Sequence, residues 1–214
     1  MILTVGGEKG GPGKSTIATT LAAMRASTGR QVVLVNADAQ PTAVRWSDAR
    51  RAVDGVAQVT TVTLRGPKIH ADIADLAKRY DDLVIDTGGH DSVELRAALV
   101  KSERLLMPLR ASHFDVWTIE KMAEIVGQAQ AINPDLTAFV VMNQVPPVSR
   151  DRLRSEMVAV MAEWPMFRLL DTVLQFRAAY SAAGGEGLSV QEMKPRDGKA
   201  AAEVSFLYRE VFDA

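Results

Sequence analysis

Short apolar runs alternate along the chain with longer segments in which apolar residues recur at helical spacing. This pattern predicts a mostly parallel, twisted sheet flanked by helices, because continuous apolar runs are typical of strands buried on both faces. The predicted strands are Ile2–Gly6, Val32–Asn36, Val59–Thr63, Leu83–Asp86, Leu105–Leu109 and Phe139–Asn143. The predicted helices are Lys14–Ser27, Pro41–Val53, Ile69–Arg79, Ser92–Val100, Val116–Ala131, Arg150–Ala162 and Lys199–Phe212.

Breaks in this pattern indicate the domain organisation. Gly29 and Asn133-Pro134 end two of the helices, and no internal repeat, low-complexity tract or change of composition marks a linker. The segment Ala183–Gly187 contains three glycines and is interpreted as a mobile loop. We therefore expect a single α/β domain that spans residues 1–214.

Composition narrows the class of protein. Of the 214 residues, 47% are hydrophobic and 24% are charged, and none is cysteine. The lack of cysteine excludes disulfides, thiolate metal sites and cysteine-ligated iron–sulfur clusters, and it suits the cytoplasm. We expect neither a secretory signal nor a spanning helix, since no apolar stretch approaches about 18 residues. Because the net charge is −1, any surface for nucleic acid would have to be a local patch.

The strongest motif follows the first predicted strand and opens the first helix. Its glycines allow backbone N–H groups to approach phosphate oxygens closely, and Lys14 can reach the β- and γ-phosphates. Ser15 is placed to ligate Mg²⁺, and Thr16 lies near the α-phosphate. The strict phosphate-loop pattern fails at one position, because Glu8 replaces its first glycine. The predicted nucleotide-binding residues of this loop are Lys9, Gly10, Gly11, Pro12, Gly13, Lys14, Ser15 and Thr16.

Lys9 adds a second cation to this loop. The string Lys-Gly-Gly-Pro-Gly-Lys-Ser-Thr resembles the deviant Walker A motif of the ParA/MinD-type ATPases, and is closest to that of the short ParF-like plasmid partition ParA proteins. In that family the extra lysine crosses a dimer interface to the nucleotide of the partner subunit. The resemblance implies that Lys9 and Lys14 are catalytic, and that Lys9 acts in trans on the transferring phosphoryl group. It also implies ATP and Mg²⁺ as cofactors and an ATP-dependent homodimer.

The segment after the second predicted strand, Asn36-Ala37-Asp38-Ala39-Gln40, looks like the Asp-x-Asp-Pro-Gln switch of the same family. The resemblance implies that Asp38 is catalytic, positions or activates the attacking water, and takes part in magnesium binding. Asn36 and Ala39 depart from the family pattern, and Asn36 removes a negative charge near the metal. Without the phosphate loop, Asp38 would be interpreted as a helix N-cap.

The fourth apolar run ends in Asp86 and continues as Thr87-Gly88-Gly89. An apolar strand that ends in aspartate is how a Walker B carboxylate is presented to Mg²⁺. Gly89, predicted to bind nucleotide, supplies flexible backbone for sensing the γ-phosphate. Taken alone, such an aspartate is often only a turn residue, so this interpretation depends on the upstream loop. The predicted metal residues are Ser15, Asp38 and Asp86.

Later segments resemble the family more diffusely. Asn143, at the end of the sixth predicted strand, matches a position whose amide reads the adenine edge, although a lone asparagine there is equally typical of a turn. Pro108, Ser112 and Asp115 resemble a segment near the dimer face, and Thr172–Val190 resembles the loop and helix beside the base.

As a function, the resemblance implies a weak ATPase that hydrolyses ATP to ADP and phosphate, and whose ATP-bound dimer binds nucleoid DNA without sequence preference. A partner protein, either ParB-like or a cargo adaptor, would stimulate hydrolysis. Plasmid DNA is the expected cargo, and a protein assembly such as a carboxysome or chemoreceptor cluster is the alternative. The expected location is cytoplasmic and nucleoid-associated.

Two other functions on the same scaffold are less favoured. A MinD-like membrane ATPase needs a basic amphipathic C-terminal helix, whereas residues 203–214 are apolar on one face but not basic, which favours a core-packing helix. A dethiobiotin-synthetase-like ligase needs an acceptor pocket and usually lacks the lysine seen here as Lys9. A role like that of the nitrogenase iron protein is excluded by the missing cysteines.

Non-specific DNA binding requires several phosphate contacts, whose number doubles on dimerisation. Taken alone, each basic cluster of this chain is also typical of an ordinary solvated face. The predicted DNA contacts are Arg150, Arg152 and Arg154 in one cluster and Lys194, Arg196 and Lys199 in a second, with Arg45, Arg50 and Arg51 as a weaker third.

Overall fold

The strands form one sheet in the order β3-β2-β4-β1-β5-β6-β7, and every neighbouring pair runs parallel. The computed structural model describes residues 1–11, 13–110 and 116–213. The strands are β1 (Ile2–Val5), β2 (Val32–Ala37), β3 (Thr60–Thr63), β4 (Asp82–Thr87), β5 (Arg104–Arg110), β6 (Thr137–Val145) and β7 (Phe167–Gln175). The helices are α1 (Lys14–Ala26), α2 (Thr42–Arg51), α3 (Ile69–Leu76), α4 (Val93–Leu99), α5 (Val116–Gln130), the 3-10 turn η1 (Pro147–Ser149), α6 (Arg150–Met161), α7 (Ala178–Gly185) and α8 (Gly198–Phe212). The predicted α/β fold is confirmed.

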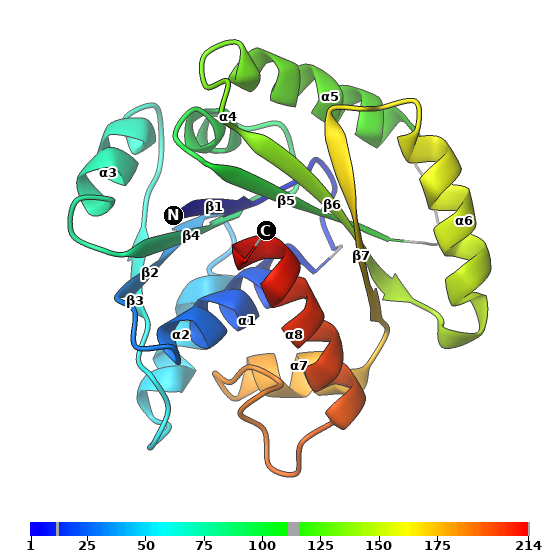
Figure 1. Ribbon diagram of the computed structural model, residues 1–214. Helices are drawn as coiled ribbons and strands as arrows, with labels where there is room; N and C mark the ends of the chain where they lie inside the picture. Colours follow the sequence, from blue (N-terminus) through cyan, green and yellow to red (C-terminus); the bar gives the residue numbers. More distant parts are fainter. Residues whose placement is uncertain (12, 111–115, 214) are drawn as a thin grey trace.

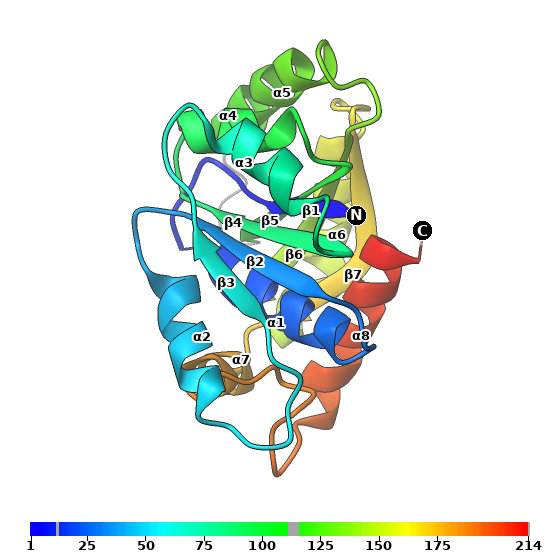
Figure 2. The same cartoon turned by 90° about the vertical axis from the view of Figure 1, so that its left-hand side faces the viewer.

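Helices cover both faces of the sheet, as Figures 1 and 2 show. α1, α2, α7 and α8 lie on one face, and α3, α4, α5 and α6 lie on the other. Successive strand residues point to opposite faces, so Leu3 and Val5 of β1 pack under α1 while Ile2 packs with α3. The apolar face of α8, including Val204 and Leu207, packs in the core, as predicted. None of the helices in the described ranges is long and apolar enough to span a bilayer.

The seventh strand was missing from the prediction. β7 lies at the edge of the sheet with β6 as its neighbour, and its apolar run is interrupted by charged residues. The Glu210 carboxylate of α8 accepts hydrogen bonds from the backbone N–H groups of Asp171 (2.7 Å) and Thr172 (2.9 Å). The Glu203 carboxylate accepts one from the N–H of Gln175 (3.2 Å). These partners are distant in sequence, so no local pattern reveals the strand.

The predicted mobile loop at Ala183–Gly187 is wrong. Helix α7 runs to Gly185, so two of the three glycines lie in its last turn. The third, Gly187, has a φ of +72°, and a Cβ atom there would lie 2.2 Å from the backbone nitrogen of Arg50 in α2. Glycine suits both the left-handed backbone and this close approach, so the segment packs against α2.

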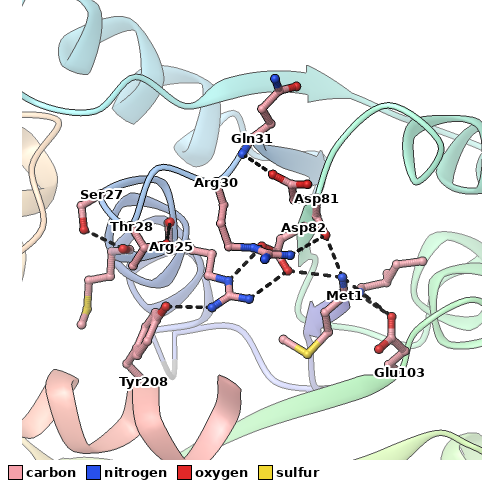
Figure 3. Close-up of polar contacts among 12 residues, drawn as sticks. Met1, Arg25, Ser27, Thr28, Arg30, Gln31, Asp81, Asp82, Glu103 and Tyr208 are labelled. Carbon is pink, nitrogen blue, oxygen red and sulfur yellow. Dashed lines mark hydrogen bonds and ion pairs between the residues drawn. The ribbon is translucent and has the colours of Figure 1, made fainter. Parts of the chain in front are cut away.

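A buried ion cluster joins the amino end of β4 to the end of α1 (Figure 3). Asp82 is fully buried, and its carboxylate accepts hydrogen bonds from the side chains of Arg25 (2.8 Å) and Arg30. The amine of Met1 donates a further hydrogen bond to it at 3.2 Å. Arg25 also donates to the Tyr208 hydroxyl of α8 at 3.0 Å. Burial opposes ionisation of Asp82, but the guanidinium groups outweigh it and hold the pKa of this carboxyl below its usual value.

Candidate functional site

The predicted motif segments gather at one edge of the sheet. Because the strands are parallel, the carboxyl ends of β1, β2, β4 and β6 meet there, and a motif segment lies at or just beyond each of these ends. Ligands of open α/β sheets bind outside these strand ends. The structure therefore brings together the phosphate loop, Asp38, Asp86 and Asn143.

Two glycines of the phosphate loop are required by its backbone. Gly11 and Gly13 both have a φ of +87°, and a Cβ atom on Gly13 would lie 2.5 Å from the side-chain nitrogen of Asn143. Gly13 precedes α1 without supplying a side-chain cap, and a helix start of this kind favours an anion at its N–H groups. The predicted residues Pro12, Ser112 and Asp115 lie outside the described residues.

Lys14 is folded onto its own loop. It is 6% exposed, and its ammonium donates a hydrogen bond to the carbonyl oxygen of Lys9 at 2.6 Å. Burial lowers the pKa of Lys14, while the carboxylates of Asp86 and Asp38 oppose this shift. A charged phosphate oxygen is a stronger acceptor than a carbonyl oxygen, so a bound triphosphate would compete for this ammonium. The Lys9 side chain is exposed.

Asp86 is the most unusual carboxylate of the site. It is fully buried at the end of β4, and neither of its carboxylate oxygens accepts a hydrogen bond of normal geometry, although the Ser15 side chain lies near enough to favour the ionised form. Burial raises the pKa of Asp86 to about 7; Ser15 and Lys14 oppose this shift, and the charge of Asp38 adds to it. A buried carboxylate without a partner is costly, which indicates that it serves a ligand.

These residues fit a magnesium ion. In nucleotide sites Mg²⁺ takes one or two carboxylates and completes its shell with phosphate oxygens and water. Asp86 offers two unpartnered oxygens beside Ser15, and Asp38 is near enough to influence the pKa of Asp86. Within the described ranges, no group of three or more histidine, cysteine, aspartate or glutamate residues could hold a metal. The donors therefore suit a cation that arrives with a triphosphate.

The segments that follow β2 and β4 lie against each other and against the phosphate loop. A Cβ atom on Gly88 would lie 3.3 Å from the Oδ1 atom of Asp38. A Cβ atom on Gly89 would lie 2.5 Å from the backbone nitrogen of Gly10. Because the clash at Gly89 is with backbone, only glycine allows this approach. Gly89 thus lies directly on the loop that is predicted to bind phosphate.

A cavity of about 260 Å³ adjoins the loop on the side of Asn143. Asn143 is buried, whereas Phe176, which follows β7, is 70% exposed. An amide and an aromatic ring beside a phosphate loop have the chemistry to hold a purine base. Phe176 lies within the segment Thr172–Val190 that the resemblance places beside the base, but no motif singles it out. The cavity is lined by residues that include Gly13, Thr16, Asn143, Gln144, Phe176, Arg177 and Tyr180.

The two main basic clusters approach a common groove of about 830 Å³. Arg150 of α6 and Lys199 of α8 both line it, together with the exposed Phe206. Arg152 pairs with Glu156 of its own helix. The remaining members are Arg154, which pairs with Asp171 and is half-buried, and the exposed Lys194 and Arg196.

Arg50 is excluded from the weaker third cluster. It is 1% exposed, and its guanidinium donates hydrogen bonds to the Glu192 carboxylate at 2.7 and 3.0 Å. It also donates to the carbonyl oxygens of Ala57 (2.8 Å) and Gly187 (2.9 Å). A buried arginine with these partners holds α2 against the segment after α7 and cannot contact DNA. The prediction for Arg50 is wrong, because its partners Gly187 and Glu192 come from a segment that is distant in the sequence.

Residues 3–190 match the family model of the CobQ/CobB/MinD/ParA nucleotide-binding domain. The chain belongs to this family. The match includes the phosphate loop, Asp38, Asp86 and Asn143, and so covers the whole gathered site. The predicted resemblance to ParA/MinD-type proteins is confirmed.

Named members of the family resemble the chain over most of its length. The maintenance of carboxysome distribution protein A of Halothiobacillus neapolitanus is 31% identical, and the match covers 98% of this chain and 95% of that protein. The protein ParA of Rhizobium radiobacter is 24% identical, with 95% and 90% covered. A solved complex of a Cyanothece McdA variant with ATP has a TM-score of 0.76 at 15% identity, and covers 99% of this chain and 96% of that one. This structural likeness supports the fold.

Proposed function

We propose that this protein is an ATP-driven, dimerising ATPase that positions or segregates a cargo on nucleoid DNA. The observation that supports it most is the orphaned Asp86 carboxylate beside Ser15 and Lys14. A buried carboxylate without a partner costs folding free energy unless a ligand uses it. The chain belongs to a nucleotide-binding family, and the complex of the Cyanothece relative contains ATP, which supports ATP as the nucleotide.

Each residue then has a defined task. Lys14 and the N–H groups at the start of α1 bind the phosphates, and Lys9 acts on the nucleotide of the partner subunit. Asp38 orients the attacking water from its place beside Gly88. Ser15 and Asp86, with Asp38 nearby, would hold Mg²⁺, which would supply positive charge against the phosphates. Asn143 contacts the base.

The cargo divides this proposal into two versions. Plasmid DNA is supported by the resemblance of the phosphate loop to that of plasmid partition ParA proteins, together with the match to protein ParA of Rhizobium radiobacter. A protein assembly is supported by the higher identity to the carboxysome distribution protein of Halothiobacillus neapolitanus. In both versions a partner protein, ParB-like or a cargo adaptor, stimulates hydrolysis. A small basic DNA-binding protein encoded next to this chain would favour the plasmid, and a carboxysome or chemotaxis cluster would favour the protein cargo.

The lysine pair provides the decisive test. Lys9→Ala should keep ADP affinity within about threefold of the wild type, but should lose ATP-dependent dimerisation and most hydrolysis, because one cation is missing from each shared site. Light scattering and phosphate release measure the two properties. Lys101→Ala, which removes an exposed lysine at the opposite end of the sheet, is the matched control. Full turnover by a monomeric, ATP-bound Lys9→Ala protein would contradict the proposal.

Asp38→Ala separates hydrolysis from dimerisation. The variant should accumulate as an ATP-bound dimer, since water is no longer oriented while the phosphates are still bound. Normal turnover in this variant would exclude Asp38 from the role.

DNA binding is tested by gel shift at several salt concentrations with ATP, ADP and no nucleotide. Non-specific binding of this kind has a Kd of roughly 10⁻⁴–10⁻⁶ M. Replacing both Arg150 and Lys199 by alanine should weaken ATP-dependent binding about tenfold and flatten its salt dependence, because phosphate contacts are lost. Arg79→Ala, which removes an exposed arginine shortly after α3, is the control. Binding that ignores nucleotide in the wild type would favour the ligase alternative.

A further inference from the structure

Arg65, in the turn between β3 and α3, is bound to the backbone of the Asp38 segment. Its Nη1 atom donates hydrogen bonds to the carbonyl oxygens of Asn36 (2.6 Å) and Leu64 (2.7 Å). Its Nη2 atom donates to the carbonyl oxygen of Asp38. One guanidinium group thus joins the carbonyls on both sides of Ala37, at the point where β2 ends.

The backbone of Asp38 is consequently held from two directions. Its N–H donates to the side-chain oxygen of Asn36 at 3.3 Å, while its carbonyl is held by Arg65. The Oδ1 atom of Asp38 accepts a hydrogen bond from the N–H of Gln40 at 3.0 Å, which fixes the start of the following turn. Asn36 is 1% exposed, so the side chain that accepts the hydrogen bond from the Asp38 N–H is itself held in the core.

The turn that carries Arg65 is also hydrogen-bonded to helix α4. The backbone N–H of Gly66 donates to the Glu94 carboxylate at 2.8 Å. Gly66 has a φ of +76°, so the turn takes a shape that glycine readily adopts. Glu94 lies in the first turn of α4, where the Ser92 side chain caps the helix by accepting the N–H of Leu95. α4 follows the Gly88-Gly89 segment that packs on the phosphate loop.

We propose that Arg65 is a positioning residue for Asp38, and that the Glu94–Gly66 contact links this positioning to the segment that follows β4. The proposal rests on the proposed role of Asp38 in hydrolysis. A displacement of Gly89 by the departing γ-phosphate would move the start of α4, and through Glu94 and Arg65 it would move the backbone of Asp38. The same set of contacts would then position Asp38 for hydrolysis and respond when the γ-phosphate leaves.

The chemistry of the side chain explains why arginine stands here. A planar guanidinium presents several N–H donors in a fixed fork, so it can hold the carbonyls of Asn36 and Asp38 at once. Lysine keeps the charge but lacks the fork, and glutamine lacks the charge as well. Arg65 is largely exposed, so its contribution lies in geometry rather than in burial.

The first experiment is a kinetic series on the full chain. Arg65→Gln should lower kcat about tenfold, because small displacements of a catalytic group cost this much or more, while ADP affinity and the KM for ATP stay within about twofold. Arg65→Lys should recover part of the loss. Arg79→Gln, at an exposed arginine shortly after α3, is the matched control. Adding Arg65→Gln to Asp38→Ala should change the residual rate less than twofold, because both changes act on one group.

The second experiment needs no hydrolysis. Amide hydrogen exchange of the peptide that spans residues 36–42 should become at least fivefold faster in Arg65→Gln without nucleotide, while exchange in β1 stays unchanged. Glu94→Ala should give a smaller increase, and Glu94→Gln, which keeps the acceptor oxygen, should give almost none.

The two experiments separate the possible failures. Wild-type protein without ATPase activity, or Asp38→Ala protein at the wild-type rate, would refute the proposed function, and the exchange data would still decide whether Arg65 holds Asp38. Unchanged exchange in Arg65→Gln overturns the positioning role. A parallel loss of kcat, ADP affinity and thermal stability also overturns it, because it indicates a merely structural residue.

Discussion

Two buried aspartates at opposite ends of β4 differ in what surrounds them. Asp82 and Asp86 are both fully buried, and the same helix, α1, supplies groups near both. At the amino end, Asp82 is paired with Arg25, Arg30 and the chain amine (Figure 3). At the carboxyl end, Asp86 accepts no hydrogen bond of normal geometry. Asp82 is thus paired within the folded chain, whereas Asp86 has the surroundings of the proposed ligand site.

The two pKa shifts express this difference. Burial acts against ionisation at both ends, but arginines reverse the outcome at Asp82, whose pKa lies below its usual value. At Asp86 burial prevails and raises the pKa to about 7. Two aspartates of one strand therefore have opposite pKa shifts because their partners differ, which fits a stabilising role for Asp82 and the proposed ligand-binding role for Asp86.

The largest effect is expected from Asp86→Asn. Loss of the metal-binding carboxylate should lower magnesium-dependent ATP hydrolysis about a thousandfold, since a bound metal supplies several kcal/mol of charge stabilisation. Phosphate release at saturating Mg²⁺ measures it. Hydrolysis within threefold of the wild type would show that Asp86 does not hold the cation.

Asp82→Asn should act on stability instead. Removing the carboxylate leaves Arg25 and Arg30 without their buried partner, which should cost about 3 kcal/mol of unfolding free energy, at the low end for buried pairs because Arg30 is 40% exposed. Urea unfolding measures this, and ADP affinity of the folded variant should equal that of the wild type. A loss of ADP affinity without a loss of stability would reverse the assignment of the two ends.

The pH dependence of stability should have opposite signs at the two ends. The folded-state pKa of Asp86 is raised, so in EDTA Asp86→Asn should be more stable than the wild type at pH 8 by on the order of 2 kcal/mol, and this difference should vanish toward about pH 4. The pKa of Asp82 is lowered, so its contribution is present above the ordinary carboxyl pKa and is lost as the pH falls through the lowered value. Urea titrations of both variants measure the two differences, from pH 8 to about pH 4 for Asp86 and below about pH 4 for Asp82. Two curves with the same slope would contradict the comparison.

The smallest effect is expected from Arg30→Gln. Its side chain is more exposed than that of Arg25, and Arg25 remains to pair with Asp82, so the loss should stay below about 1 kcal/mol. Arg25→Gln should cost more, because that side chain also binds Tyr208 and lies over the Phe212 ring. Thermal unfolding of both variants at one pH shows which of the two loses more stability.

Contiguous motifs were the predictable part of this molecule. A phosphate loop needs glycines, a lysine and a hydroxyl at fixed short spacing, so residues 9–16 predicted the centre of the candidate site. Asp38 and Asp86 were recognisable because each comes at the end of, or just after, an apolar run. Parallel pairing then places the ends of those runs at one edge of the sheet, as the structure shows.

Contacts between distant segments could not be predicted in this way. Arg65 lies in a turn without a motif, and its acceptors Asn36 and Asp38 lie 29 and 27 residues away. Arg50 looked like one more surface cation, because its partner Glu192 is 142 residues away. β7 escaped prediction for the same reason, since its edge is closed by side chains of α8.

The outer edge of β7 is closed to further strands. Glu203 and Glu210 occupy backbone donors that an incoming strand would need, so recruitment of a peptide or a second sheet along this side would first have to displace two carboxylates. Association along this edge of the sheet is thereby directed away from strand pairing and toward contacts made by side chains of helices and loops.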